Sequence, residues 1–235
     1  MNIIFLGAPG AGKGTQARKL VAEFDLVQLS TGDMLRESQS SNTEIGKKVA
    51  SIMNPGELVS DDIVISLIKE RLSKTHARGF IFDGFPRTIG QASALDKLLD
   101  KHDTSITAVI EMKVDNEALV DRITGRYSCG ECGEVYHESS KPLLSTSVCI
   151  KCGAAKLKKR VDDNEESLRT RLDEYNNKTA PLIEYYLNKG ILYSVDGLAD
   201  IEVINSAINK ILYFLHTSFM VFANSFVHIL TPPSP

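Results

Sequence analysis

The segment Gly7–Thr15 is rich in glycine and carries one lysine near its end, in the order Gly-Ala-Pro-Gly-Ala-Gly-Lys-Gly-Thr. Glycines allow backbone angles and close approaches that a Cβ would forbid. The N–H groups of such a turn and the N-terminus of a following helix bind anions, and Lys13 adds a point charge. The segment therefore predicts a phosphate-binding loop. Gly14 stands where such loops usually have Ser or Thr, so a hydroxyl ligand for Mg²⁺ is not assigned, although Thr15 follows.

All four cysteines of the chain occur as two close pairs, Cys129 with Cys132 and Cys149 with Cys152. Zn²⁺ prefers four thiolates in a tetrahedron, and a closed set of four leaves no position for catalysis. The chain opens without a basic segment or a small-residue cleavage site, so we expect a cytoplasmic protein in which disulfides are disfavoured. The spacing predicts a structural zinc site rather than free or disulfide-paired cysteines, and the metal would fasten a small segment without a core of its own.

Short apolar runs alternate with longer helical patterns along the chain. The runs that we expect to form strands are Asn2–Leu6, Val27–Leu29, Gly79–Phe82, Ala108–Met112 and Leu192–Val195. The expected helices follow the phosphate loop and cover Asp61–Lys74, Ile89–Lys101, Asn116–Arg126 and Glu165–Lys189. Strands that alternate with helices predict an α/β fold, with a parallel sheet covered on both faces.

Two stretches interrupt this alternation and divide the chain. Residues 30–59 are polar and helical in pattern, and residues 126–160 hold the cysteines. We interpret both as insertions at the sheet edge where parallel sheets bind ligands. The core would then comprise residues 1–29, 60–125 and 161–212, with 213–235 as an apolar tail.

The composition fits an ordinary soluble protein. The 235 residues include 43% hydrophobic and 24% charged residues, which is enough apolar material for one core with insertions. The net charge of −3 argues against a dedicated nucleic-acid binder, which usually presents a basic face.

Three motifs occur in order: the phosphate loop, Ser30-Thr-Gly-Asp-Met-Leu-Arg36 and Phe82-Asp-Gly-Phe-Pro-Arg-Thr88. Together they closely resemble adenylate kinase of the bacterial long-lid type, over roughly residues 1–213. The resemblance implies a P-loop NTPase-like sheet flanked by helices, with two inserted mobile subdomains: a monophosphate-binding insertion at 30–59 and a zinc-bearing lid at 126–160. It implies a monomer that converts ATP and AMP to two ADP with Mg²⁺. A kinase with UMP, CMP or GMP as acceptor, or a non-catalytic nucleotide switch, are the alternatives.

The resemblance also implies a set of site residues. Those for ATP are Gly10, Ala11, Gly12, Lys13, Gly14, Thr15, Arg126, Val135, Tyr136 and Ala199. Those for AMP are Thr31, Arg36, Glu57, Leu58, Val59, Gly84, Phe85, Pro86, Arg87, Gln91, Arg160 and Arg171. The catalytic set would be Lys13, Asp83, Arg87, Arg122, Arg126, Arg160 and Arg171.

The roles of the charged residues follow from the same resemblance. Arginine offers a planar fork suited to phosphate oxygens, and Asp83 would orient Mg²⁺ through water, with Asp33 either sharing that task or capping a helix. Arg122 and Arg126 stand four residues apart, so we expect them on one face of a helix; a solvated salt-bridge face is the alternative. Asp162 and Asp163 would hold the lid arginines when the lid closes.

The tail from residue 211 onward contains no Asp, Glu, Lys or Arg. Apolar residues recur at alternating spacings of three and four, which predicts a helix. These residues are Leu212, Leu215, Phe219, Phe222, Phe226 and Ile229. We favour packing on the core or on another subunit. Membrane association and a disordered or non-native extension are the alternatives. Membrane association ranks below packing because the stretch only reaches the minimum length of a membrane span and lacks basic flanking residues.

Overall fold

A five-stranded parallel sheet forms the centre of the molecule. The computed structural model describes residues 1–40, 43–139, 141–142 and 148–227. The strands are β1 (Ile3–Leu6), β2 (Val27–Ser30), β3 (Phe80–Asp83), β4 (Ala108–Lys113) and β8 (Leu192–Asp196), in the order β2-β3-β1-β4-β8. All five expected strands are present, with bounds within one or two residues of the predicted ones.

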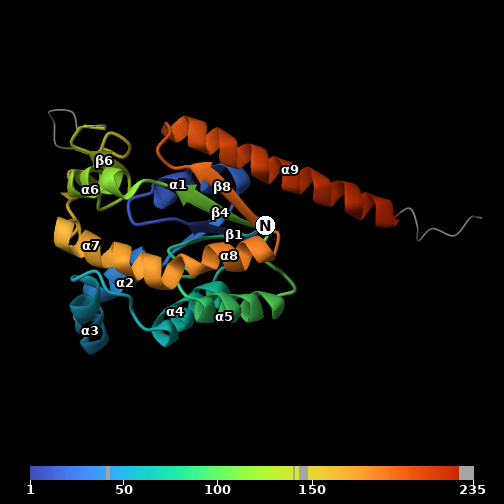
Figure 1. Cartoon of the computed structure of the whole chain (residues 1–235), viewed down its shortest axis with the longest axis horizontal. Helices are drawn as coiled ribbons and strands as arrows, with labels where there is room; N and C mark the ends of the chain where they lie inside the picture. Colours follow the sequence, from blue (N-terminus) through green and yellow to red (C-terminus); the bar gives the residue numbers. More distant parts are fainter. Residues whose placement is uncertain (41–42, 140, 143–147, 228–235) are drawn as a thin grey trace, which may run out of the picture.

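The sheet is buried on both faces because side chains alternate along each strand. In β1, Ile4 and Leu6 belong to one apolar cluster, whereas Ile3 and Phe5 belong to a second. The first cluster joins α2 (Thr31–Ser40), α3 (Glu44–Met53), α4 (Asp61–Lys74), α5 (Ile89–Asp100) and α8 (Pro181–Asn188). The second joins α1 (Lys13–Phe24) and α9 (Ile201–Val227). Figure 1 shows these helices on opposite sides of the sheet. The fold is the predicted α/β class.

The two stretches that interrupt the alternation differ in structure. The segment 30–59 consists mainly of α2 and α3, as its polar helical pattern predicts. The cysteine-bearing segment forms a small antiparallel sheet of β5 (Arg126–Cys129), β6 (Val135–His137) and β7 (Leu157–Lys158), in the order β6-β5-β7. Its short strands have no apolar alternation that would reveal them in the sequence.

Two helix predictions need correction. α6 (Asn116–Thr124) ends before Arg126, which begins β5, so Arg122 and Arg126 do not share a helix face. Gly125 is the C-terminal cap of α6, and its backbone N–H donates to Asp121 O and Ile123 O. A Cβ at Gly125 would lie 2.5 Å from His137 Nε2. The predicted helix 165–189 is also interrupted: a π-helical turn, η1 (Tyr175–Thr179), separates α7 (Glu165–Glu174) from α8.

The first part of the tail packs on the core as the continuation of α9. Leu212 is fully buried and Leu215 packs against the same cluster, while the Tyr213 hydroxyl donates to Glu23 at 3.2 Å. These contacts agree with the favoured interpretation up to Leu215. The side chains of Phe219, Phe222, Phe226 and Ile229 lie outside the described part of the chain. Figure 1 shows α9 running past the sheet, and no helix of the described residues is long and apolar enough to cross a membrane.

Two substitutions, one on the buried face of α9 and one on its exposed face, test this packing. We expect Leu212→Ala to lower the free energy of unfolding by about 2–5 kcal/mol, because it removes a buried side chain and leaves a cavity. Phe214 is 68% exposed, so Phe214→Ala should change stability by less than about 0.5 kcal/mol. Urea denaturation of both variants makes the comparison, and equal losses would contradict the described packing.

Candidate active site

A cavity of about 750 Å³ opens at the carboxyl end of the sheet. This size is within the range of small-molecule sites. Its lining comes from the phosphate loop, α2, the turn after β3, the cysteine-bearing sheet, α7 and the segment 197–204. Segments distant in the sequence therefore meet around one space, as parallel sheets with insertions at that edge allow.

The phosphate loop has the backbone that its glycines predict. Gly10 and Gly12 adopt φ angles of 85° and 95°, which non-glycine residues rarely adopt, and α1 begins directly at Lys13. The Lys13 ammonium donates to the carbonyl oxygens of Gly7 at 2.7 Å and Ala8 at 2.9 Å. Burial lowers the pKa of Lys13 to about 8, although the nearby Asp83 carboxylate acts in the opposite direction.

Asp83 lies beside this loop, at the end of β3. A Cβ at Gly14 would lie 3.1 Å from Asp83 Oδ2, and Gln28 Nε2 donates to that oxygen at 2.9 Å. The position agrees with the prediction from the strand end. Since Gly14 lets the carboxylate approach the loop this closely, the departure from the usual Ser or Thr has a structural reason.

Arg36 and Arg87 line the side of the cavity formed by α2 and the turn after β3. Arg36 Nη2 contacts Asp33 Oδ1 at 2.6 Å, and Arg87 Nε donates to the Gly84 carbonyl at 2.8 Å. Burial is the largest cause that lowers the pKa of Arg87 to about 10, followed by repulsion from Arg171. The surrounding protein groups thus neutralise only part of the positive charge in the site.

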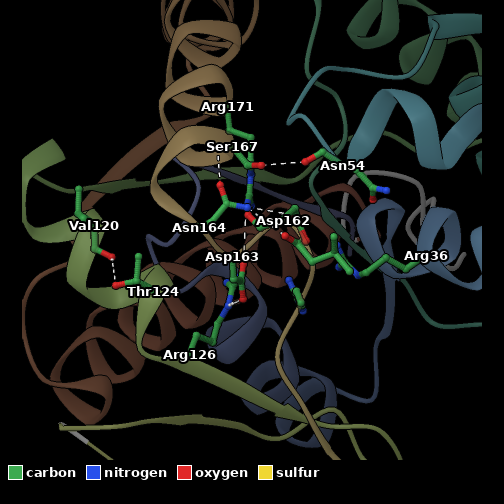
Figure 2. Close-up of polar contacts among 12 residues, drawn as sticks. Arg36, Asn54, Val120, Thr124, Arg126, Asp162, Asp163, Asn164, Ser167 and Arg171 are labelled. Carbon is green, nitrogen blue, oxygen red and sulfur yellow. Dashed lines mark hydrogen bonds and ion pairs between the residues drawn. The ribbon is translucent and has the colours of Figure 1, made fainter.

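The arginines opposite them pair with the two aspartates expected to hold them. Arg126 Nε donates to Asp163 Oδ2 at 2.8 Å, and Arg126 Nη2 also contacts Asp163 Oδ1. Arg171 Nη1 lies 3.1 Å from Asp162 Oδ2 and 3.8 Å from Asp163 Oδ1. Figure 2 shows Asp163 facing Arg126, close to the start of α7. Two carboxylates thus orient two of the arginines predicted to bind phosphate.

Arg160 and Arg122 complete the cationic lining. Arg160 Nη2 lies 3.7 Å from Asp33 Oδ1, so the cysteine-bearing insertion reaches the other insertion. Arg122 Nη1 donates to the Gly197 carbonyl at 2.8 Å. Burial first, and repulsion from Arg126 second, lower the pKa of Arg160 to about 10. Seven predicted cations line the same cavity: Lys13, Arg36, Arg87, Arg122, Arg126, Arg160 and Arg171.

Five predicted site residues do not line the cavity. Thr31 and Gln91 are buried and bonded within the protein: the Thr31 hydroxyl donates to Gly84 O at 2.8 Å, and Gln91 Nε2 donates to Asp61 Oδ1 at 2.7 Å. Val59 and Phe85 belong to the apolar core. Glu57 is the fifth, and the remaining predicted ATP and AMP residues do line the cavity.

Several lining residues were not predicted from the sequence. They include Arg18 in α1, Lys141 and His137 in the cysteine-bearing insertion, and Leu198 and Ile201 next to the predicted Ala199. None stands in a motif. The helical periodicity after the phosphate loop predicts that Arg18 lies one turn beyond Gly14 on the same helix face, which would have indicated its place at the cavity. No sequence pattern indicates that Lys141 or Ile201 lines the cavity.

The four cysteines meet at one point, as their spacing predicts. Their sulfur atoms all lie within 4.8 Å of one another, with Cys129–Cys152 at 3.6 Å and Cys132–Cys149 at 3.5 Å. A tetrahedral Zn²⁺ with bonds of about 2.3 Å requires sulfur separations of about 3.8 Å. Tyr136 is buried against the group, and its hydroxyl lies 3.2 Å from Cys149 Sγ. The geometry and donor type therefore fit this metal.

Comparison with known proteins identifies the family. The family model described as adenylate kinase matches residues 5–191. The chain belongs to the adenylate kinase family. It is similar to the adenylate kinases of Paracoccus denitrificans (59% identity), Rhizorhabdus wittichii (53%) and Erythrobacter litoralis (51%). Each alignment covers 90% of this chain and 97–100% of the relative.

Membership in the adenylate kinase family confirms several predictions. It confirms the predicted fold class and the predicted enzyme, an ATP:AMP phosphotransferase. The family reaction uses ATP with Mg²⁺ and AMP, which explains a cavity lined by so many cations. The alignments with the relatives extend over 212 or 213 residues, so about twenty residues of this adenylate kinase have no counterpart in them.

The lowered pKa of Lys13 predicts a pH dependence of ATP binding. In the ligand-free site the amine loses its proton as the pH rises through about 8, whereas bound phosphates favour the ammonium. Above that pH, binding must include protonation, so the Kd for ATP should rise by up to about tenfold per pH unit. Calorimetric titrations without AMP between pH 7 and 9.5 measure this. Lys13→Arg should bind more weakly but without that bend, because arginine stays charged throughout; an identical bend in both proteins would contradict the assignment.

Proposed function

We propose that the cavity holds the two nucleotides of the adenylate kinase reaction end to end. The observation that carries this assignment is the convergence of seven predicted cations on one cavity. ATP would lie between the phosphate loop, the Val135–Tyr136 strand and the segment around Ala199. AMP would lie between Arg36, Arg87 and the backbone around Leu58. Arg122, Arg126, Arg160 and Arg171 would surround the phosphoryl group between the two nucleotides.

In this arrangement the transfer is direct. An oxygen of the AMP phosphate attacks the γ-phosphorus, and the bond from that phosphorus to the bridging oxygen of the departing ADP breaks. Lys13 and the arginines offset the charge that spreads over the transferring oxygens. Their fixed partners, such as Asp163 for Arg126, keep the donors oriented before the reaction. The two insertions close the cavity and exclude water, which would otherwise accept the phosphoryl group.

The residues beside the phosphate loop fit a magnesium ion bound with ATP. Carboxylates are oxygen ligands of the kind that Mg²⁺ prefers, and Asp83 places one next to Gly14. Asp83 would hold the ion through water, and Asp33, in the helix that follows the neighbouring strand β2, would share that task. When bound, Mg²⁺ neutralises charge on the β- and γ-phosphate oxygens.

The cysteine group is proposed to bind a structural zinc ion. Cys129 and Cys149 are buried within a small sheet whose apolar cluster consists of only a few side chains, including Tyr136 and Leu157. Four thiolates leave no open position, so the metal would stabilise the lid and take no part in the transfer.

The proposed setting is the cytoplasm, where a reduced cysteine set is expected, and the proposed state is a monomer. The contacts of α9 support the latter, since the described part of the tail covers the protein's own core through Leu215. Membrane association of the tail is not favoured.

Removal of the Lys13 charge tests the assignment of the phosphate loop. We expect Lys13→Ala to lower kcat by about 10²–10³-fold, because a fixed charge is lost where negative charge develops. A coupled assay of ADP formation from ATP and AMP measures this. Lys74→Ala serves as the control, because Lys74 pairs with Glu70 on an exposed face of α4. An unchanged rate in Lys13→Ala would contradict the proposed mechanism.

Metal removal tests the zinc site. We expect the purified protein to contain one zinc per chain by elemental analysis, and chelation to lower its Tm, because metal binding supplies folding energy to the lid. Cys149→Ser should have the lower Tm before chelation and show no further change with chelator. A protein without metal whose melting is unaffected by chelator would refute the proposal.

A further inference from the structure

The contact between the end of the monophosphate-binding insertion and α7 is not explained by any nucleotide-binding motif. The Ser167 hydroxyl donates to the backbone carbonyl of Asn54 at 2.8 Å, across 113 residues of sequence. Ser167 is only 4% exposed, so water cannot readily replace this bond. Figure 2 shows the two residues facing each other, one on α7 and the other at the edge of the insertion.

Both partners of this bond stand at helix ends. Asn54 is the C-terminal cap of α3, where the last carbonyl groups have no partner within the helix. Ser167 is in the first turn of α7, and its own N–H donates to the side chain of the cap residue Asn164 at 2.9 Å. The side chain of Asn164 therefore fixes the first turn of α7 through the Ser167 N–H. The Ser167 hydroxyl is left to bind the end of α3.

The segment that follows Asn54 lies directly against α7. Gly56 has a φ of 100°, and a Cβ there would lie 2.5 Å from Ser167 O and 2.9 Å from Arg171 Cγ. Only glycine permits both this backbone angle and this approach. Gly56 and Leu58 line the cavity. We call residues 54–59 the return limb, because they lead from α3 back to the core.

Ser167 and Arg171 are four residues apart, so they lie on the same face of α7. The limb therefore packs on the helix face that also presents Arg171 to the cavity. We propose that Ser167 is a positioning residue for the monophosphate site: its hydroxyl fixes the return limb on α7 and thereby sets the distance between that limb and Arg171. This inference rests on the proposed assignment of AMP to this side of the cavity.

Ser167→Ala removes the bond and leaves a buried carbonyl without a partner. We expect the KM for AMP to rise about fivefold, the effect of one unsatisfied buried hydrogen bond, with the KM for ATP unchanged. Ser167→Thr retains the hydroxyl and should restore most of the affinity for AMP. Ser51→Ala is the matched control, because the Ser51 hydroxyl binds a carbonyl of its own helix, Lys48 O, within the same insertion. Initial rates with each nucleotide varied in turn measure all four proteins.

A second variant and a second measurement separate positioning from a general loss of structure. Gly56→Ala should raise the KM for AMP more than Ser167→Ala does, because the added Cβ meets the Ser167 backbone. In Ser167→Ala, hydrogen exchange of the amides of Gly56, Glu57 and Leu58 should become faster, while the Tm should fall by only about 2–4 °C, the effect of one lost buried hydrogen bond in a chain of this size. An equal rise in KM for both nucleotides, or no rise for AMP, would overturn the inference.

Arg36→Ala distinguishes failure of the inference from failure of the assignment on which it rests. If Arg36→Ala raises the KM for AMP and Ser167→Ala does not, the site assignment stands and the positioning role is wrong. If neither variant affects AMP, the monophosphate side itself is wrongly placed.

Discussion

Burial of several cations around one cavity is the constraint on which this structure depends. Lys13, Arg87, Arg160 and Arg171 all have a lowered pKa, and desolvation is the largest cause for each. The carboxylates Asp33, Asp83, Asp162 and Asp163 offset part of this cost and orient the guanidinium groups. The remaining positive charge favours the binding of polyanions, and the phosphates of two nucleotides supply the negative charge that balances it.

The sheet makes this arrangement possible because it is rigid and buried on both faces. β1 and β3 end at the phosphate loop and at Asp83, so the loop and the carboxylate are fixed by neighbouring strands. The arginines, in contrast, come mainly from helices and from the insertions. Carboxylates orient these arginines, as Asp163 does for Arg126, so the sheet and the ion pairs together fix the charges around the cavity.

The features that could be predicted from the sequence are those encoded by residues close together in the chain. The phosphate loop, Asp83 and the cysteine pairs each depend on local spacing, and each was located correctly, as were the five strands. The four-residue spacing of Arg122 and Arg126 predicts a shared helix face, but α6 ends at Thr124 and Arg126 begins β5, which no local pattern indicates. The resemblance assigns Thr31 and Gln91 to the AMP site, and the structure shows what sequence cannot: that their polar atoms bind Gly84 O and Asp61 Oδ1. Lys141 and Ile201 come from long-range folding, which no local pattern reveals.

Besides its apolar packing on the core, the segment 30–59 makes two different kinds of polar contact with the rest of the protein. The Asp33–Arg160 ion pair, at 3.7 Å and with Asp33 partly exposed, is long and screened by solvent. The Ser167–Asn54 bond is short and buried, and its loss leaves an unsatisfied carbonyl. Ion pairs of the first kind form and break at little cost, whereas a buried bond resists opening. Arg160 of the cysteine-bearing insertion thus meets Asp33 in an ion pair that solvent weakens, whereas α7 holds the end of α3 next to Arg171 through a buried hydrogen bond.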